Sequence, residues 1–488
     1  DLKRPMKPRS LVFHEGDEKV KPLSNSELLS RLAVVGFPAY PLECGGRVLG
    51  LTSAALVGQH GDTTALAAIA LGNALTKVTG SYVIYGLSTG VTTKSSQDWG
   101  AGNYHAIGIT LQRGILILMV LVNLPVAALW LSSRWVLEAT GQHPDVARLV
   151  GLFALVRLPG LPFMTVNQVL TQTLCSMSNL YIKLATGVFI GGLNVVLSFL
   201  LIPYLGFIGA PLSATICDIA ENTGLTLMTM NDKEFRKCWR GFKYEAWQDW
   251  GSLLRVSCPA CVLFGVESMS WDVNNFVAGF ISPLAQATQA VAPQIADLQY
   301  STGLSLGTAA VTVIGNLFGE GQTNAARRSV FLIAALCCFL MALQVTVFAV
   351  LRTKVAGLFT SDSSMLDGIV DLLPITLLFS FLDGHQAALT GVIQAAGKQY
   401  LVAPLVLVCY WIVGIPLGLV LTWGCFGLPS LGLKGLWMGM VVGVAGHLLC
   451  VAVAVACLDW HEITAEVQER THQEHGDKGQ EPLVAKGM

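Results

Sequence analysis

Long apolar runs recur along nearly the whole of this 488-residue chain, and they constrain its fold more than any other feature. Most runs are about 20 to 28 residues long, and a helix needs about 20 apolar residues to cross the hydrocarbon core of a bilayer. Only helices and closed barrels satisfy their backbone groups in lipid, and these runs lack the alternation of barrel strands. The sequence therefore predicts an all-α polytopic membrane protein.

We expect twelve transmembrane helices in two six-helix halves. Their predicted boundaries are residues 32–57, 65–91, 107–131, 146–175, 181–203, 208–230, 250–280, 287–314, 329–351, 368–394, 400–423 and 434–457. Only 12% of the residues are charged, whereas soluble domains average about 25%. The predicted domains are an N-terminal tail (1–31), an N-lobe (32–230), a basic linker (231–249), a C-lobe (250–457) and a disordered C-terminal tail (458–488).

Lysines and arginines gather in the two tails and the linker, and they predict the orientation of the chain. With twelve spans both tails and the linker lie on the same side of the membrane, and basic loops stay in the cytoplasm. Both termini are therefore expected to be cytoplasmic. The segment from Lys3 to Arg31 lacks the pattern of a signal peptide. The sequence leaves open whether the membrane is the plasma membrane or that of a vacuole or other organelle.

Several classes of function find no support in the composition. A net charge of −1 gives no reason to expect nucleic acid as a partner. Most cysteines lie inside apolar runs and match no disulfide or zinc framework. The sequence contains no clustered nucleophile or metal motif such as HExxH, so we expect neither an enzyme nor a metal or cofactor site. The expected partners are the lipid bilayer and a small-molecule substrate, and the expected state is a monomer.

An internal repeat relates the two halves. Residues 86–103 match residues 305–322 at a shift of 219, and each copy ends a helix in a polar-aromatic-Gly-x-Gly turn. Glycine favours the left-handed conformation that such a helix end requires. Gln168 and Gln386 match at nearly the same shift, 218. A parallel repeat of six spans is typical of secondary transporters, which bind substrate between or within the repeats.

Glu267 lies near the centre of the seventh predicted span. A charge at mid-bilayer costs about 2.5–3.5 kcal/mol or more, which marks such residues as functional candidates. Trp271 and Asn274 follow at i+4 and i+7 on the same helix face. Asp272 faces elsewhere and nearer the interface, where a hydrated polar position explains it as well as a functional one.

The tenth span carries a polar stripe headed by an acid. Asp383, Gln386, Thr390 and Gln394 fall within about 80° of one another on an otherwise apolar helix. Water or a partner helix must line that stripe. We therefore expect Glu267 and Asp383 to bind the coupling proton or cation.

Three further acids are secondary candidates. Glu43 in the first span precedes Arg47 by four residues, so a self-neutralised pair explains it as well as function does. Asp218 and Glu221 in the sixth span are three residues apart, near mid-depth, where they could hydrate or bind protons. Their role stays open from the sequence.

Intramembrane acids of this kind supply the chemistry of an antiporter. Poor hydration disfavours the ionised form of a carboxyl group, and a nearby cation favours it. A proton and a cationic ligand then compete for one site. One pH unit is worth about 1.4 kcal/mol, enough for roughly tenfold uphill export at one-to-one exchange.

At these positions the sequence resembles the multidrug and toxic compound extrusion (MATE) family, in its eukaryotic branch. The resemblance covers residues 30–457, and its most specific pieces are residues 96–104, 111–113, 315–321 with 325–327, 383–386 with 397–399, and 410–416. It implies a V-shaped pair of six-helix bundles with alternating access. It also implies export of organic cations, xenobiotics or metabolites in exchange for H⁺, or alternatively Na⁺.

The same resemblance implies roles for individual residues. Glu267 and Asp383 occupy the positions of acids that eukaryotic members use, and Asp272 matches a second acid of animal members. Two positions depart from the family: Gln294 stands where animal members have another acid, and Ser53 stands near the first-helix aspartate of bacterial members. The residues expected around the substrate cavity are Trp271, Asp272, Asn274, Gln294, Gln386, Thr390, Gln394 and Tyr410.

Two alternatives remain. A lipid-linked substrate flippase of the same superfamily predicts a cationic groove, but the spans hold few basic residues apart from Arg47, Lys77 and Arg157. A membrane-embedded enzyme would need a clustered metal or nucleophile motif, which the sequence lacks. A receptor would not need two homologous lobes. The two halves also differ in chemistry, because Thr165 stands where Asp383 stands in the second copy and Val48 stands where Glu267 does. This asymmetry indicates coupling in the C-lobe.

Overall fold

The computed structural model describes residues 23–60, 63–360 and 362–476, without the side chains of residues 46–60, 63–67, 70 and 474–476. The described residues form helices and no strand. The side chains of Arg47, Val48 and Ser53 therefore lie outside the described part of the chain.

Six helical segments build the N-lobe. They are α1 (Asn25–His60), α2 (Thr63–Thr76) continued by η1 (Lys77–Ser81) and α3 (Tyr82–Gly100), α4 (Tyr104–Ile117) continued by η2 (Leu118–Asn123) and α5 (Leu124–Ala139), α6 (Pro144–Arg157) continued by η3 (Leu158–Gly160) and α7 (Leu161–Ser176), α8 (Tyr181–Leu205), and α9 (Gly209–Asn231). The short turn η4 (Gly206–Ile208) follows α8. The linker contains two more, α10 (Phe235–Cys238) and η5 (Tyr244–Trp247).

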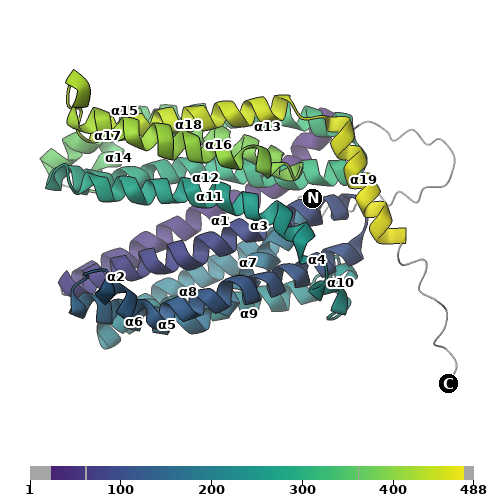
Figure 1. Cartoon of the computed structure of the whole chain (residues 1–488), viewed down its shortest axis with the longest axis horizontal. Coiled ribbons are helices and arrows are strands. Elements are labelled where there is room, and N and C mark those ends of the chain that lie inside the picture. Colours follow the sequence, from purple (N-terminus) through teal and green to yellow (C-terminus); the bar gives the residue numbers. More distant parts are fainter. Residues whose placement is uncertain (1–22, 61–62, 361, 477–488) are drawn as a thin grey trace.

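Six further segments build the C-lobe. They are α11 (Trp250–Ala278), α12 (Pro283–Gly319), α13 (Thr323–Val350), α15 (Ser363–Ala395), the broken helix α16 (Ala403–Leu407), η7 (Val408–Gly414) and α17 (Ile415–Trp423), and α18 (Leu433–Ala456). The short elements between them are α14 (Arg352–Gly357), η6 (Gln399–Leu401) and η8 (Cys425–Gly427), and α19 (Trp460–Gly476) ends the described chain. The two lobes form separate layers that meet near α19 and spread apart towards the opposite end (Figure 1).

The protein is a multi-pass membrane protein. Nine helical stretches of the described chain are long and apolar enough to span a bilayer, and one of them, Tyr181–Asn231, contains both α8 and α9. The prediction of an all-α protein with twelve helices in two lobes is confirmed. The second predicted span ended at residue 91, whereas α3 continues to Gly100. Its polar last turns stay helical because they are buried: Ser95, Ser96 and Asp98 are fully shielded from solvent.

The internal repeat is visible in the ends of α3 and α12. Gly102 and Gly321 adopt left-handed φ angles of 73° and 69°. Just beyond each glycine, the Asn103 N–H donates to the Asp98 carbonyl and the Gln322 N–H donates to the Leu317 carbonyl, both at 2.8 Å. These are matching Schellman ends, in which glycine permits the left-handed residue.

The same two helix ends pack against each other where the lobes meet. Gly100 lies directly against the backbone of Asn316, and Gly319 against the carbonyl of Gln97, with no room for a Cβ atom. The Gln97 side chain also donates to the Ala395 carbonyl of α15 at 2.8 Å. Close backbone packing of small residues is a common way for membrane helices to associate. Here it joins the N-lobe to the C-lobe.

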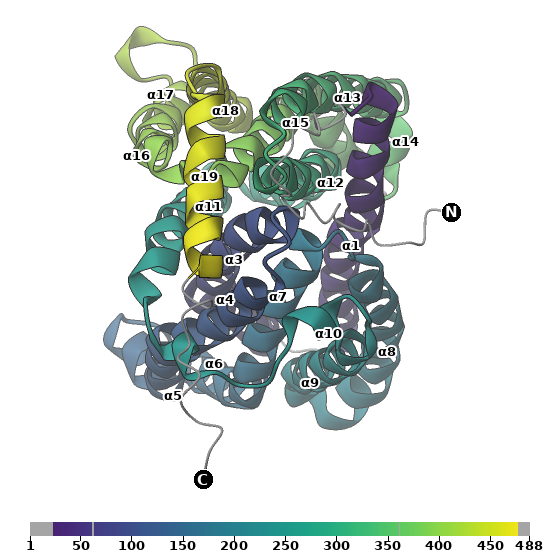
Figure 2. The ribbon, with the colours of Figure 1, turned by 90° about the vertical axis from the view of Figure 1, so that its right-hand side faces the viewer.

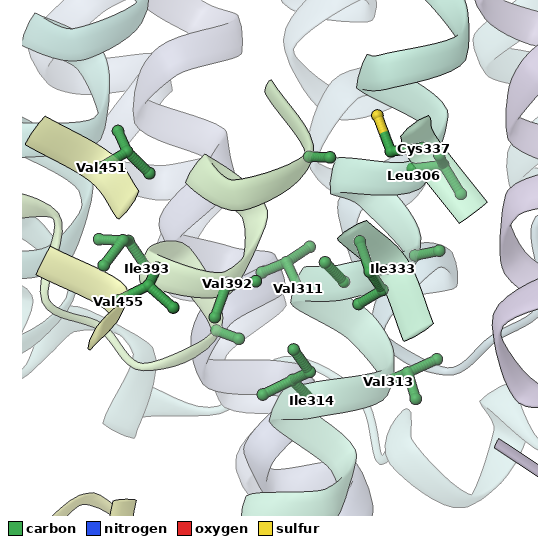
Figure 3. Close-up of a cluster of buried hydrophobic side chains, with 14 of the residues drawn as sticks. Leu306, Val311, Val313, Ile314, Ile333, Cys337, Val392, Ile393, Val451 and Val455 are labelled. Atoms are coloured by element: carbon green, nitrogen blue, oxygen red, sulfur yellow. The ribbon is translucent and has the colours of Figure 1, made fainter. Parts of the chain in front are cut away.

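The core of the C-lobe lies around α12. Leu306, Val311 and Ile314 of α12 pack against side chains of α13, α15 and α18 (Figure 3). The partners are Ile333, Cys337, Val392, Ile393, Val451 and Val455. This apolar packing fixes α12 and α15 relative to one another, and so positions the polar residues that they carry.

Helix α19 corrects the prediction of disorder for residues 460–476 of the C-terminal tail, and residues 477–488 lie outside the described part of the chain. Residues 460–476 form a helix that crosses the end of the molecule from the C-lobe to the N-lobe (Figure 2). Arg470 forms an ion pair with Asp98 of α3 at 2.9 Å. On the C-lobe side, Gln468 donates to the Gly319 carbonyl at 2.5 Å and Lys398 pairs with Glu466 at 2.9 Å. The polar composition suggested disorder, but these tertiary contacts order the segment.

Substitution of Gly100 by alanine tests the lobe contact. The new Cβ would overlap the Asn316 backbone, which cannot move like a side chain. Overpacking of this kind costs about 1–3 kcal/mol, so we expect a clearly lower melting temperature in detergent. Gly251→Ala is the matched control, because a Cβ atom added to Gly251 would have nothing within 4 Å. Equal melting temperatures for the two variants would contradict the close approach.

Substitution of Arg470 by glutamine tests the docking of α19. Loss of the Asp98 ion pair is expected to speed amide hydrogen exchange in residues 460–476 several-fold, whereas Gln473→Ala, which removes a contact with Glu469 of the same helix, leaves it unchanged. Unchanged exchange in the Arg470 variant would contradict the docking.

The hydrogen bond to Glu466 raises the pKa of Lys398 above its usual 10.5. That contact therefore holds at neutral pH and weakens as pH rises through the raised pKa.

Candidate functional site

Close packing of α12 on α15 positions the polar stripe of the tenth span. Gly303 lies against the backbone of Gly384, and Gly307 against the Ala387 carbonyl, at contacts where a Cβ atom would not fit. Asp383 immediately precedes this contact and is 3% exposed. The glycines thus hold the stripe at the interface between helices and away from lipid.

The stripe continues into a buried polar cluster. The Gln386 amide donates to the Thr390 hydroxyl at 3.0 Å and lies 3.3 Å from Nε2 of His447 on α18. His447 is fully buried, and its ring meets that of Tyr410 edge-on at 5.8 Å between centroids. Helix α15, which carries Asp383, therefore shares a network of polar and aromatic contacts with α18 and with the π-helical turn η7.

Glu267 lies across from this cluster, on α11. Its carbonyl accepts a hydrogen bond from Ser270 at 2.6 Å, and the neighbouring Val266 carbonyl accepts one from the Trp411 indole at 3.1 Å. Glu267 lines the same cavity as Gln386 and Thr390, whereas Asp383, three residues before Gln386, is buried and does not line that cavity. The two acids predicted from the sequence are thus brought to the same region of the C-lobe.

A small cavity of about 80 Å³ opens beside Glu267 where the lobes face one another. No lysine or arginine lies among its described lining residues. The C-lobe contributes Glu267, Tyr300, Gln386, Thr390, Gln394 and His447, and the N-lobe contributes Tyr85, Thr89, Thr92 and Gln172. The hydroxyl of Thr92 donates to the side chain of Gln172. The cavity therefore offers hydroxyl, amide, aromatic and carboxyl groups from both lobes.

Other residues expected at the cavity lie elsewhere. Trp271 packs edge-on against Phe379 and Trp437, at 4.9 and 5.5 Å between ring centroids. Asn274 is 2% exposed and does not line the cavity. Trp271 therefore packs within the C-lobe instead of facing the cavity beside Glu267.

Asp272 and Gln294 also lie away from the cavity. Asp272 is half-buried and interacts electrostatically with Lys77 of η1. Gln294 donates to the carbonyl of Ala290 in its own helix at 2.8 Å. Tyr410 is fully buried and does not line the cavity either.

The secondary acids Glu43, Asp218 and Glu221 line a different and larger cavity, of about 1180 Å³, in the N-lobe. Asp218 pairs with Arg157 at 2.7 Å and Glu221 with Lys183 at 2.5 Å. The sequence suggested that these two acids hydrate or bind protons, and the structure gives each a basic partner. The two partners come from α6 and α8, which the sequence could not pair with α9.

The chain is similar to known membrane transporters over both lobes. The MatE family model matches residues 46–200 and 259–420, one segment in each lobe. The chain belongs to the MatE family of transporters. Multidrug and toxin extrusion protein 2 of the rabbit (Oryctolagus cuniculus) is 30% identical over 413 residues, which are 84% of this chain and 68% of the relative. Multidrug and toxin extrusion protein 1 of Homo sapiens is 26% identical over 448 residues, 91% of this chain and 77% of the relative.

Solved MATE structures share the fold. The crystal structure of the eukaryotic MATE transporter AtDTX14 matches with a TM-score of 0.84 at 24% identity, over 91% of this chain and 99% of that chain. An outward-facing multidrug resistance MATE transporter matches with a TM-score of 0.78 at 17% identity, over 92% and 100%. The relatives are named as transporters, in agreement with the prediction that the chain is not an enzyme.

Several cavity residues of this MATE transporter were missed from the sequence. His447, Tyr300, Tyr85 and Gln172 all line the cavity beside Glu267. His447 carried a usable signal, because an ionisable residue inside a predicted span is a functional candidate. The tyrosines and the glutamine carried none, since such residues also occur as packing residues between helices. No group of side chains suited to a metal ion occurs among the described residues.

Substitution of Trp271 by alanine separates packing from ligand contact. Removal of a large aromatic side chain from a packed cluster costs about 3–5 kcal/mol, so we expect a strongly lowered melting temperature in this MATE transporter. Gln394→Ala should change the melting temperature little, because Gln394 faces the cavity. A Trp271 variant with wild-type stability and impaired ligand binding would instead assign Trp271 to the cavity.

Proposed function

We propose that this protein is a secondary active antiporter that exports organic cations, xenobiotics or metabolites in exchange for protons by alternating access. One observation carries the proposal: Glu267 lines a cavity whose described lining holds no lysine or arginine, and Asp383 is buried on α15, three residues before Gln386, which lines the same cavity. No lysine or arginine of the described cavity wall neutralises the Glu267 carboxyl there. It can be neutralised by a proton or by a cationic ligand, and the two compete.

The rest of the transport cycle follows from the two-lobe frame. The lobes are in contact near α19, and we propose that this end faces the cytoplasm, with both termini on that side. Movement about the α3–α12 contact would open the cavity to one side at a time. The protein would act as a monomer in the plasma membrane or an organellar membrane. The names of the relatives, multidrug and toxin extrusion proteins, support export of foreign compounds.

Two alternatives are less well supported. Sodium coupling requires several oxygen ligands around one ion, and Glu267, Thr390 and Gln386 of the cavity lining would supply them. A lipid-linked flippase needs a cationic groove for pyrophosphate. The described lining of the cavity beside Glu267 offers none, and Arg157 and Lys183 of the N-lobe are paired with acids.

Uptake into proteoliposomes tests the proposal. Tetraethylammonium is a suitable probe, because its permanent charge keeps it from crossing lipid unaided. With one-to-one exchange, one pH unit across the membrane should accumulate it roughly tenfold. Glu267→Gln and Asp383→Asn should each reduce pH-driven uptake by more than tenfold. Glu138→Gln, which removes an acid that is paired with Arg134 and does not line the cavity, should leave uptake unchanged.

The ion is identified in the same vesicles. A sodium gradient without a pH gradient should drive no accumulation. Accumulation by sodium alone would replace the proton with sodium and keep the same acids. Undiminished pH-driven uptake in both acid variants would refute the coupling role of the C-lobe site.

A further inference from the structure

The basic linker between the lobes lies apart from the cavity beside Glu267 and contributes no residue to its described lining. At the end of the molecule that carries α19, the linker passes over the N-lobe from the end of α9 to the start of α11 (Figure 2). Both helices belong to stretches that are long and apolar enough to span a bilayer. Because its two ends leave the membrane on the same side, the linker lies near the level of the lipid headgroups.

The middle of the linker carries a concentrated positive charge. Residues 236–243, which we call the basic turn, read Arg-Lys-Cys-Trp-Arg-Gly-Phe-Lys and contain four basic residues and no acid. Arg240 and Lys243 are exposed to solvent. The acids of the linker are each in contact with another group: Asp232 accepts from the Phe235 N–H at 2.9 Å, Glu234 pairs with Lys237 at 2.5 Å, Glu245 lies 4.0 Å from His105, and Asp249 lies 3.8 Å from Arg113.

Buried contacts hold the basic turn in one shape. Phe235, just before the turn, is fully buried. Gly241 adopts a left-handed φ of 79°, which bends the chain there. The side chain of Gln112 on α4 then holds both sides of the bend: its amide donates to the Gly241 carbonyl and its oxygen accepts from the Lys243 N–H, both at 2.9 Å. The N-lobe therefore presents the side chains of this turn from an ordered backbone.

Aromatic side chains accompany the positive charge. Phe242 is 88% exposed on the turn, and Tyr244 and Trp247 just beyond it are 77% and 55% exposed. Trp239 meets the Phe242 ring edge-on, at 5.3 Å between centroids. Exposed apolar groups beside polar ones mark interaction sites, and aromatic rings are enriched where headgroups meet hydrocarbon. An apolar ring between two basic side chains fits a membrane surface better than a free anion in water.

We propose that the basic turn is a docking surface for anionic phospholipids, in which Arg240 and Lys243 bind the headgroup phosphates and Phe242 enters the apolar layer beneath them. Each basic residue near an anionic membrane adds attraction that fades within a Debye length, about 8 Å at physiological salt. Through Gln112 the docked turn would hold the end of α4 at a fixed depth. The proposal depends neither on the coupling acids nor on which side of the membrane the termini face.

Amide hydrogen exchange in lipid nanodiscs tests the surface. The purified full chain is compared in nanodiscs of phosphatidylcholine with and without phosphatidylglycerol, which supplies the anionic headgroup. Phosphatidylglycerol should slow exchange in the basic turn about fivefold or more, because bound headgroups shield its backbone. High salt should reverse the slowing, since it screens exposed charges. Equal exchange in the two membranes would overturn the proposal.

Paired substitutions locate the surface. Arg240→Gln with Lys243→Gln should abolish the slowing by phosphatidylglycerol and leave the melting temperature unchanged, because both side chains are exposed. The matched control is Arg352→Gln with Lys354→Gln, which removes two exposed basic residues from α14 of the C-lobe and should keep the full slowing. Full slowing in the Arg240/Lys243 variant, or its loss in the control, would overturn the assignment to the basic turn.

Two further measurements separate a lipid surface from a soluble anion. Inorganic phosphate added to phosphatidylcholine nanodiscs should leave exchange in the basic turn unchanged, and slowing equal to that by phosphatidylglycerol would overturn the assignment to a membrane. Phe242→Ser keeps the charges but removes the ring, so it should lose most of the slowing. Full slowing in that variant would overturn the insertion of Phe242 into the membrane.

Discussion

The contact between the ends of α3 and α12 is the constraint on which the rest of the structure depends. Gly100 and Gly319 bring the two helix backbones together where side chains would hold them apart. The contact joins equivalent helices of the two repeats, so it lies near the axis that relates the lobes. Polar groups of α3 can be buried there only because α12 covers them. Helix α19 adds an ion pair and hydrogen bonds across the same end.

The two lobes share one arrangement of helices but differ in the polar residues that those helices carry. Gln386 lines the cavity beside Glu267 and its repeat partner Gln168 lines the N-lobe cavity, so both copies of the repeat place a glutamine on a cavity wall. The equivalent of Asp383 is Thr165, which is fully buried and donates to the Asn123 side chain at 2.9 Å. The N-lobe instead keeps acids on α9, each paired with a base. The N-lobe cavity therefore has a lysine or arginine beside each acid of α9. The described wall of the cavity beside Glu267 has neither.

The features that the sequence predicted are those set by local pattern. Apolar run length predicted the spans, the repeat predicted the matching glycine turns, and helical periodicity predicted the polar stripe from Asp383 to Gln394. Glu267 stood out because an acid in an apolar run needs an explanation. Each of these inferences uses residues within a few helical turns of one another.

The features that the sequence did not predict depend on contacts between distant segments. Nothing near Asp218 in the chain indicates that Arg157 lies against it. Trp271 shares a helix face with Glu267, but Phe379 and Trp437 from two other helices draw it into the C-lobe. Residues 460–476 have the composition of a disordered tail, and their order comes from Asp98 and Gly319.

Proton release on ligand binding tests the central claim most directly. The claim is that a proton and an organic cation compete for the carboxyls of Glu267 and Asp383. When tetraethylammonium is added to the purified protein in weakly buffered solution, a pH dye should report proton release. A Glu267→Gln/Asp383→Asn double variant should release none. Cation binding to the wild-type protein without proton release at any pH from 5 to 8 would contradict the account.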